Sequence, residues 1–235
     1  MSITERARRY EGAYHDELYA NHDLFSPGTW LYKPAAYAVR SFARIPKRAH
    51  PSALDLGGGV GRHSIPLAQH LGVRSKVVCV DLLDSAISRL NINARKHGVE
   101  DNIVGIVSDV ETYKFEQPYD YVLSISCIEH VPTKLRLKSL INRLQEATAP
   151  DGVHCFMMIT DNVWVDSATK AHLTPLIEQN LTAEETIAML NELYQGWQIH
   201  DLSTKNWQAT QLIGEREVIL ESTCVQFTVQ KQSEY

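Results

Sequence analysis

The chain has 235 residues, of which 44% are hydrophobic and 22% are charged, and its formal net charge is −5. This length suits one sizeable domain, or one domain with a short appendage, and the composition is that of an ordinary globular protein. It excludes a disordered chain, a collagen-like repeat and a small disulfide scaffold, and the acidic balance disfavours a nucleic-acid binder.

The first 50 residues are predicted to form a helical cap. Apolar side chains recur there at helical spacing, at Ala7, Tyr10, Tyr14 and Leu18. A second helix is predicted over about 34–44, because proline is tolerated in a first turn. This segment holds half of the ten tyrosines and has a net charge of +3, whereas the remainder carries −8. We therefore expect a helical cap or lid over 1–50 on a single α/β domain over 51–235.

From residue 51 the chain alternates between strand and helix patterns. Short apolar runs, typical of strands buried on both faces of a parallel sheet, predict strands over 53–56, 76–81, 102–109, 119–127 and 153–160. Apolar stripes at helical spacing predict helices over 62–71, from Asp84 or Ser85 to Gly98, around 137–144 and over about 182–194.

The end of the chain changes character. Two strands are predicted over 196–203 and 222–230, with only a loop or short turn elements between them, which is typical of an antiparallel edge. The whole pattern predicts an α/β fold: a doubly wound, Rossmann-like, mostly parallel sheet with an antiparallel C-terminal strand and an N-terminal helical cap.

A glycine-rich turn joins the first predicted strand to the first predicted helix. It reads Asp55-Leu56-Gly57-Gly58-Gly59-Val60-Gly61, and glycines there let the backbone turn tightly and approach a ligand. Asp81 ends the second strand and Asp109 the third. Together with Asp55 they predict three acids along the edge where open α/β sheets bind ligands. A carboxylate there can accept hydrogen bonds from ribose hydroxyls or an adenine amino group.

The glycine spacing differs from the dinucleotide fingerprint G-x-G-x-x-G, because Arg62 stands where the third glycine would be. Asp55, two residues before the first glycine, would repel a pyrophosphate and would suit a ligand that carries positive charge. Both features disfavour a nicotinamide-dependent oxidoreductase, which stays the alternative enzyme class on a similar sheet.

Residues 51 to about 230 resemble the class I S-adenosylmethionine-dependent methyltransferases. The matching motifs are LDLGGGVG (54–61), VDLL with Asp81, SDV (108–110), SISCIEHV (124–131) and the APDG turn (149–152). The resemblance implies that Gly57, Gly59 and Gly61 line the methionine and ribose part of S-adenosylmethionine. It implies that Asp81 binds the ribose hydroxyls, that Asp109 binds adenine, that Leu82 packs on the adenine face and that Ser126 lies near the sulfonium. Asp55, Val110 and Gly58, which replaces a small polar residue or Cys, complete the expected cofactor-binding set.

Two narrower resemblances concern small-molecule methyltransferases. The segment LTAEETIAMLNELYQGWQIHDLSTK, followed by a long terminal strand, is similar to the C-terminal part of the bacterial tellurite-resistance methyltransferases. The arginine-rich catalytic set of that family has no clear match here. IEHV resembles the ubiquinone-biosynthesis and related small-molecule methyltransferases.

Glu129 and His130 are the candidate catalytic residues, since they follow the fourth strand on the loop that faces the transferable methyl group in this fold. A histidine near its ordinary pKa of about 6.5 can take a proton from an attacking oxygen or nitrogen. The alternative is that the pair only packs against the edge of the cofactor, because methyl transfer often needs positioning more than a base.

Tyr10, Tyr14 and Trp30 are the candidate lid and acceptor-pocket residues. Tyr10 and Tyr14 lie one helical turn apart, so the alternative is ordinary packing of a helix face. As a lid they would exclude water and shape the acceptor pocket.

The four cysteines form no CxxC pair, and the ten histidines form no HExxH or other metal spacing. We expect no metal, a reducing cytoplasmic location, and neither a membrane nor a nucleic acid as partner. The charged N-terminus is unlike a signal peptide, and no stretch approaches the roughly 18 to 20 apolar residues of a spanning helix. The predicted function is methyl transfer from S-adenosylmethionine to a small-molecule acceptor by direct displacement. A non-catalytic protein that binds the same cofactor is the alternative outside catalysis.

Overall fold

The computed structural model describes residues 2–116 and 118–233 of the chain. One eight-stranded sheet runs through it in the order β3-β2-β1-β4-β5-β8-β7, with the short β6 paired to β5 outside this path. The central strands are β1 (Ser52–Leu56), β2 (Lys76–Asp81), β3 (Ile103–Val107), β4 (Tyr119–Ile125) and β5 (Thr148–Asp166), and they pair in parallel. This confirms the predicted α/β fold with a mostly parallel sheet.

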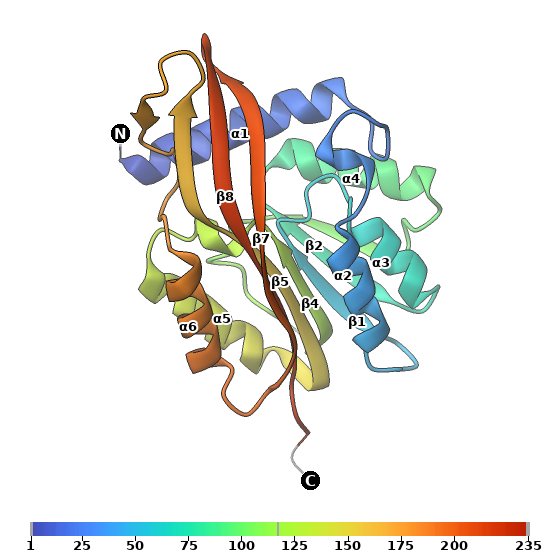
Figure 1. Cartoon of the computed structure of the whole chain (residues 1–235). Coiled ribbons are helices and arrows are strands. Elements are labelled where there is room, and N and C mark those ends of the chain that lie inside the picture. Colours follow the sequence, from blue (N-terminus) through green and yellow to red (C-terminus); the bar gives the residue numbers. More distant parts are fainter. Residues whose placement is uncertain (1, 117, 234–235) are drawn as a thin grey trace.

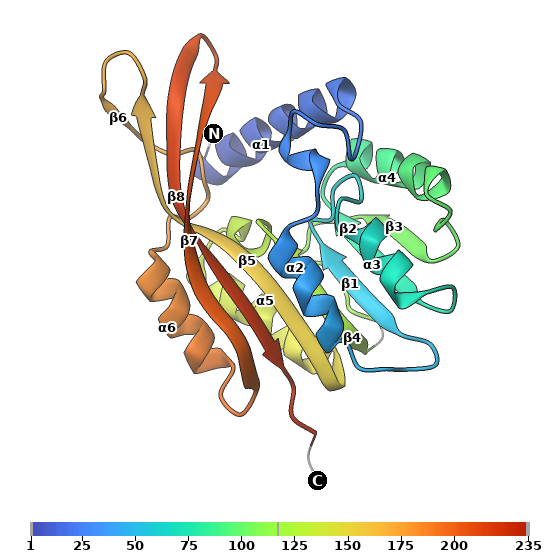
Figure 2. The ribbon, with the colours of Figure 1, turned by 45° about the vertical axis from the view of Figure 1, so that its right-hand side comes forward.

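Helices cover both faces of the sheet, as Figures 1 and 2 show. On one face lie α2 (Ala36–Ser41), α3 (Ser64–Leu71) and α4 (Asp84–Lys96), and on the other lie α5 (Lys134–Glu146) and α6 (Ala183–Leu193). Alternate residues of one strand therefore enter different cores: Ala53 packs with the first group, and Leu54 with the second. Most residues of the central strands that enter the two cores are apolar, which is why the strands read as nearly continuous apolar runs.

The expected helices all form, with small differences at their ends. The segment predicted as a helix over about 34–44 is α2 followed by a 3₁₀ turn, η2 (Phe42–Arg44). The helix α1 (Ile3–Asn21) begins at a capping box in which the Ser2 and Glu5 side chains each accept from the other's backbone N–H. A second 3₁₀ turn, η1 (Trp30–Tyr32), follows it.

The C-terminal strands are much longer than predicted. β7 (Gln198–Ile213) and β8 (Arg216–Gln230) form one continuous antiparallel hairpin, so the loop expected between residues 203 and 222 is wrong. β7 is the edge strand, and most of its side chains are exposed, so it carries no apolar alternation that a sequence pattern could reveal. The antiparallel placement itself is confirmed, because β8 pairs antiparallel with both β5 and β7.

Three strands extend beyond the carboxyl edge of the parallel sheet. β4 ends opposite Met157, whereas β5 continues to Asp166 and pairs there with the first half of β8. We call this extension the β-wall: residues 158–166 of β5, 205–213 of β7 and 216–224 of β8, together with β6 (His172–Leu173). Figure 2 shows it rising above the sheet beside α1.

Helix α1 crosses the carboxyl ends of the strands and contacts both sides of this opening. At one end the Tyr10 hydroxyl donates to Gln211 Oε1 of β7 at 2.9 Å, and at the other the Ser85 hydroxyl of α4 donates to Asp16. The edge where a parallel sheet binds ligands is thus roofed by α1 and flanked by the β-wall. None of the helices in the described ranges has the length and apolar run needed to cross a bilayer.

Candidate active site

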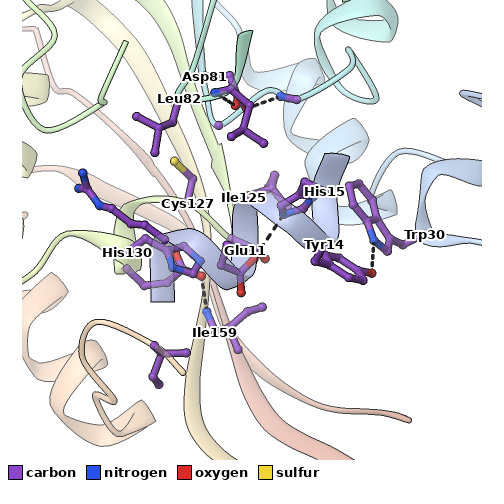
Figure 3. Close-up of a pocket in the computed structure, with 18 of the residues that line it drawn as sticks. Glu11, Tyr14, His15, Trp30, Asp81, Leu82, Ile125, Cys127, His130 and Ile159 are labelled. Carbon is purple, nitrogen blue, oxygen red and sulfur yellow. Dashed lines mark hydrogen bonds and ion pairs between the residues drawn. The ribbon is translucent and has the colours of Figure 1, made fainter. Parts of the chain in front are cut away.

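A cavity of about 420 Å³ lies between the carboxyl ends of the parallel strands, α1 and the β-wall. This volume is within the usual range for small-molecule sites. Figure 3 shows Asp81 and Leu82 on one side of the cavity, Ile159 on the other, and side chains of α1 between them. We call the part around residues 57–59, 81–82 and 109–110 the loop end, and the part around residues 129–130 and the β-wall the far end.

The glycine loop is packed so tightly that side chains are excluded. Gly57 has a φ of 65°, and a Cβ built on it would lie 2.5 Å from Cβ of Cys127. Gly59 has a φ of 57°, and its Cβ would lie 2.7 Å from the Tyr19 hydroxyl oxygen. Both conformations favour glycine. Gly57, Gly58 and Gly59 line the cavity, whereas Gly61 does not and packs against Ile65 and Leu90.

Asp55 lies behind this loop and does not line the cavity. The structure therefore corrects the expectation that Asp55 contacts the ligand. It is 1% exposed, and its Oδ2 accepts a hydrogen bond of 2.6 Å from the Ser64 hydroxyl. Burial, opposed by that bond and assisted by the charge of Asp81, raises the pKa of Asp55 to about 7. Asp55 therefore supports the loop from beneath through the first turn of α3.

Asp81 is placed as the sequence predicted, at the end of β2 and in the cavity wall. Its two carboxylate oxygens accept from the backbone N–H groups of Gly59 and Leu83, at 2.9 and 3.0 Å. Burial raises its pKa, while these two bonds act in the opposite direction. A carboxylate has about four acceptor positions, so both oxygens keep capacity for hydroxyl donors.

Asp109 and Val110 also line the loop end, beside Leu82. Oδ1 of Asp109 accepts from the Glu111 N–H at 2.9 Å, and Oδ2 forms an ion pair of 2.8 Å with Arg8 of α1. The structure therefore brings two of the three predicted strand-end acids into one cavity. It also places a cation of the cap on the second of them.

Arg62 provides a second cation at the loop end. One of its terminal nitrogens donates to the Trp30 carbonyl at 3.0 Å, and its guanidinium lies 4.8 Å from the centre of the Trp30 ring. Burial lowers its pKa to about 10, so it remains charged at neutral pH. Its Nε is buried with no hydrogen-bond partner in residues 2–116 and 118–233.

Ser126, which directly follows β4, also lines the cavity. Its φ of 53° is uncommon for a residue with a side chain, and its N–H donates to the Met157 carbonyl at 2.8 Å. Such strained positions gather at functional sites. Cys127, which follows it, also lines the cavity, and burial raises the pKa of its thiol.

Glu129 lies in the wall of the far end, on the 3₁₀ turn η3 (Ile128–His130) that follows β4. It is 7% exposed, and Oε1 accepts from the Ile159 N–H at 2.8 Å. Oε2 is buried and lacks a hydrogen-bond partner among the described residues. Burial raises the pKa of this carboxyl above its ordinary value.

His130 differs electrostatically from the sequence expectation. Its Nδ1 lies 3.0 Å from Oε2 of Glu178, whose side chain is 1% exposed. Burial alone would lower the pKa of His130, but the bond to Glu178 and the charges of Glu129 and Glu11 outweigh it and raise the pKa to about 9. The imidazole is therefore a cation at neutral pH, and the expected pKa near 6.5 is wrong.

The predicted lid residues all line the cavity. Tyr10 contacts the β-wall through Gln211 and through the ring of Trp164, at 5.7 Å between centroids, and the Trp30 indole N–H donates to the Tyr14 hydroxyl at 3.1 Å. Trp164 and Trp207 of the β-wall also line it.

The sequence patterns do not predict several residues that line the cavity, among them Arg8, Glu11, His15, Tyr19, Glu178 and Gln211. Those on α1 share one helical face with Tyr14 and Leu18, so extending the apolar stripe to polar side chains would have found them. Glu178 lies in an irregular segment without periodicity, where no comparable signal exists.

The parallel half of the sheet is similar to a known protein family. Residues 53–152, from β1 into β5, match the family model described as "Methyltransferase domain". Comparison with curated protein sequences gives no match.

Solved structures share the fold at low sequence identity. TehB from Haemophilus influenzae has a TM-score of 0.64 and 20% identity over 84% of this chain, and the match spans 62% of the TehB chain, less than two thirds of its length. A structure from work on the conversion of a disulfide bond into a thioacetal group during echinomycin biosynthesis has a TM-score of 0.61 and 18% identity, covering 94% of this chain and 93% of that one. The N-methyltransferase NodS from Bradyrhizobium japonicum, in complex with S-adenosylhomocysteine, has a TM-score of 0.55 and 14% identity, covering 95% and 100%.

The solved structures share the fold of this chain, and the family match indicates which type of domain residues 53–152 form. The family match covers the glycine loop at the end of β1 and the acids that end β2 and follow β3. Over residues 53–152 the chain is similar to a methyltransferase domain, and this match favours methyl transfer over the nicotinamide alternative.

Proposed function

We propose that the chain transfers the methyl group of S-adenosylmethionine to a small-molecule acceptor held beneath α1. The observation that carries this proposal is the continuity of the cavity. One space joins the glycine loop, Asp81 and Asp109 to a far end lined by Glu129, His130 and the β-wall. Such a space suits a cofactor at one end and an acceptor at the other.

The loop end fits the cofactor chemically. Gly57, Gly58 and Gly59 offer backbone without side chains, and Asp81 has free acceptor capacity for ribose hydroxyls. Asp109, Val110 and Leu82 would surround the adenine, and Ser126 would lie near the sulfonium. We add Arg62, whose buried Nε has no hydrogen-bond partner among the described residues and suits the carboxylate of the methionine part.

When bound, S-adenosylmethionine supplies a methyl group on a positively charged sulfur, which an acceptor atom can displace directly. The chain's own residues have to align the acceptor and keep water out. The contacts of Tyr10 with Gln211 and of Tyr14 with Trp30 support a role for residues 1–50 as a lid over the domain formed by 51–235.

We assign the acceptor end to Glu129 and His130. His130 is held by Glu178 as a cation at neutral pH, so it would orient the acceptor or donate a hydrogen bond unless it first loses its proton. Glu129 has one buried carboxylate oxygen that accepts no hydrogen bond from residues 2–116 or 118–233, and it is the better proton acceptor of the two.

Two structural relatives support a small acceptor at the level of fold. One is an N-methyltransferase, and another belongs to echinomycin biosynthesis. The four free cysteines and the acidic balance support a cytoplasmic location and a partner other than nucleic acid.

Titration calorimetry with the full chain tests the cofactor assignment. We expect S-adenosylmethionine and S-adenosylhomocysteine to bind and NAD not to bind. Asp81→Ala should weaken both sulfur ligands roughly tenfold to a hundredfold, since hydrogen bonds to a charged group are worth about 1.5–3 kcal/mol.

The exposed Asp101→Ala is the matched control and should leave the affinities unchanged. Circular dichroism should show that both variants stay folded. Binding of NAD without a response to either sulfur ligand, or an unchanged affinity of Asp81→Ala, would contradict the assignment.

A further inference from the structure

The far end of the cavity carries more negative charge than its own cations balance. Three carboxylates, those of Glu11, Glu129 and Glu178, surround the imidazolium of His130. All three act on it through their charge, and Glu178 also accepts its hydrogen bond. The other nearby cation, Arg8, is shared between Asp109, at 2.8 Å, and Glu178, at 3.9 Å. Counted with Asp109, four carboxylates therefore face the two cations Arg8 and His130, which leaves an excess of negative charge.

Glu129 is only partly hydrogen-bonded by the residues that the structure describes. It is more than nine-tenths buried, it lines the cavity, and its Oε2 accepts no hydrogen bond within the described residues. A buried carboxylate oxygen left without a donor is unfavourable. An acceptor molecule that brings an N–H donor and a positive charge would remove that penalty.

Glu11 reaches the same space from the lid. Its carboxylate lies 3.4 Å from Nε2 of His15, and burial, which would raise its pKa, is outweighed by His15 and His130, so that its pKa is lowered and it stays ionised. In Figure 3 its side chain points from α1 toward His130 and Ile159. Two carboxylates from different elements thus face one space.

Aromatic rings complete the surroundings. Tyr10, Tyr14 and Trp164 line the same cavity, with Ile159 and Leu220 as apolar neighbours. Ring faces attract cations, and apolar side chains accommodate a hydrocarbon body. An anionic acceptor would meet unbalanced carboxylates there, and the sulfonium of the bound cofactor balances at most one of them.

We propose that the methyl acceptor is a primary or secondary amine on an apolar or aromatic body, bound as its ammonium ion between Glu129 and Glu11 and methylated on nitrogen. This inference rests on the proposed function and names its substrate class. The ammonium first gives one proton to the Glu129 carboxylate. The nitrogen lone pair then forms a bond to the methyl carbon, and the carbon–sulfur bond breaks with its electron pair left on sulfur. The products are a methylated ammonium ion and neutral S-adenosylhomocysteine.

Three probes with one common body test the charge preference. They are 2-phenylethylamine, 2-phenylethanol and 3-phenylpropionate, each titrated calorimetrically into the full chain saturated with S-adenosylhomocysteine. We expect the amine to bind at least about tenfold more tightly than the alcohol, and the acid to bind most weakly. With S-adenosylmethionine instead, mass spectrometry should find the amine methylated on nitrogen.

The variant Glu129→Gln keeps the shape of the side chain and removes its charge. It should weaken the amine about tenfold to a hundredfold and leave the alcohol nearly unchanged. Glu146→Gln, at an exposed position at the end of α5, is the control and should change neither affinity. The affinity of Glu129→Gln for S-adenosylhomocysteine shows that the variant is folded, and if it does not fold, the ranking of the probes on the native chain decides.

The outcomes separate this inference from the proposed function. If S-adenosylhomocysteine does not bind the native chain, both fall. If it binds and the amine binds no more tightly than the alcohol or the acid, the amine inference alone is overturned. Equal weakening of amine and alcohol by Glu129→Gln would also overturn it.

Discussion

His130 takes its charge from a carboxylate that is distant in sequence. The bond of 3.0 Å between its Nδ1 and Glu178, together with Glu129 and Glu11, holds its pKa at about 9 against the opposite effect of burial. A histidine whose pKa is higher in the folded chain than its unfolded value of about 6.5 stabilises the fold fully below pH 6.5. That stabilisation is lost as the pH rises through about 9.

The variant Glu178→Gln should therefore lower the pKa of His130 and weaken this pH dependence. We expect the free energy of unfolding, measured with urea, to fall less between pH 6.5 and 9.5 in the variant than in the native chain, and the imidazole signal in NMR to titrate at lower pH. Glu192→Gln, which removes an exposed partner of Lys138, is the control and should titrate like the native chain. A native His130 that titrates near 6.5 would contradict the pairing.

The residues of the loop end were predictable because their positions follow from the ends of strands. Asp81 and Asp109 follow apolar runs, and strand ends in a parallel sheet share one edge. Asp55 was misplaced because it precedes the last residue of β1, and its side chain enters the space beneath the loop beside Ser64. The role of Glu178 depends on tertiary contacts alone.

Helix α1 is held over the cavity by a small number of polar contacts. Besides Tyr10 and Gln211, the ion pair of 2.8 Å between Arg8 and Asp109 joins the first half of the helix to the loop end. Only Ala7 and Tyr19 of this helix are fully buried, so the helix has little apolar anchoring. Elements with few buried contacts open locally at low cost.

Arg8→Gln should make α1 open more often. A partly exposed ion pair is worth up to about 1 kcal/mol, so cleavage of the helix by a protease present in trace amounts should accelerate by up to roughly fivefold. Arg9→Gln changes an exposed arginine of the same helix and should leave the rate unchanged. Equal cleavage rates for the two variants would show that the ion pair does not hold the helix.

For the cap, the helical pattern predicts the element itself but not the element that it packs against. The spacing of Ala7, Tyr10, Tyr14 and Leu18 predicted the helix correctly, and its tyrosines do line the cavity. The partner of that helix, the β-wall, was missed. β7 is an exposed edge strand rich in polar residues, and its length is fixed by pairing with β8 and not by its own pattern.

At the scale of the whole molecule, the cavity is built by the two ends of the chain upon a central sheet. The α/β alternation from β1 to β5 was predictable, since each strand is a continuous apolar run and each helix has its own stripe and caps. The meeting of Tyr10 with Gln211, 201 positions apart, was not, because it depends on the lengths of β5, β7 and β8 beyond the parallel sheet.

Truncation of residues 1–24 separates the two ends of the cavity. The sheet and both helical layers remain, so we expect a folded domain of lower stability, since Tyr19 and Leu24 leave the core. Asp81, Gly57 and Gly58 also remain, so the truncated chain should still bind S-adenosylhomocysteine, although more weakly. Methyl transfer should fall far more than binding, because the acceptor end then lies open to water and loses Tyr10, Glu11 and Tyr14. Calorimetry and product formation give the two quantities. In the native chain, bound S-adenosylhomocysteine should slow proteolysis of α1, and a truncated chain with full activity would mean that the roof does not serve catalysis.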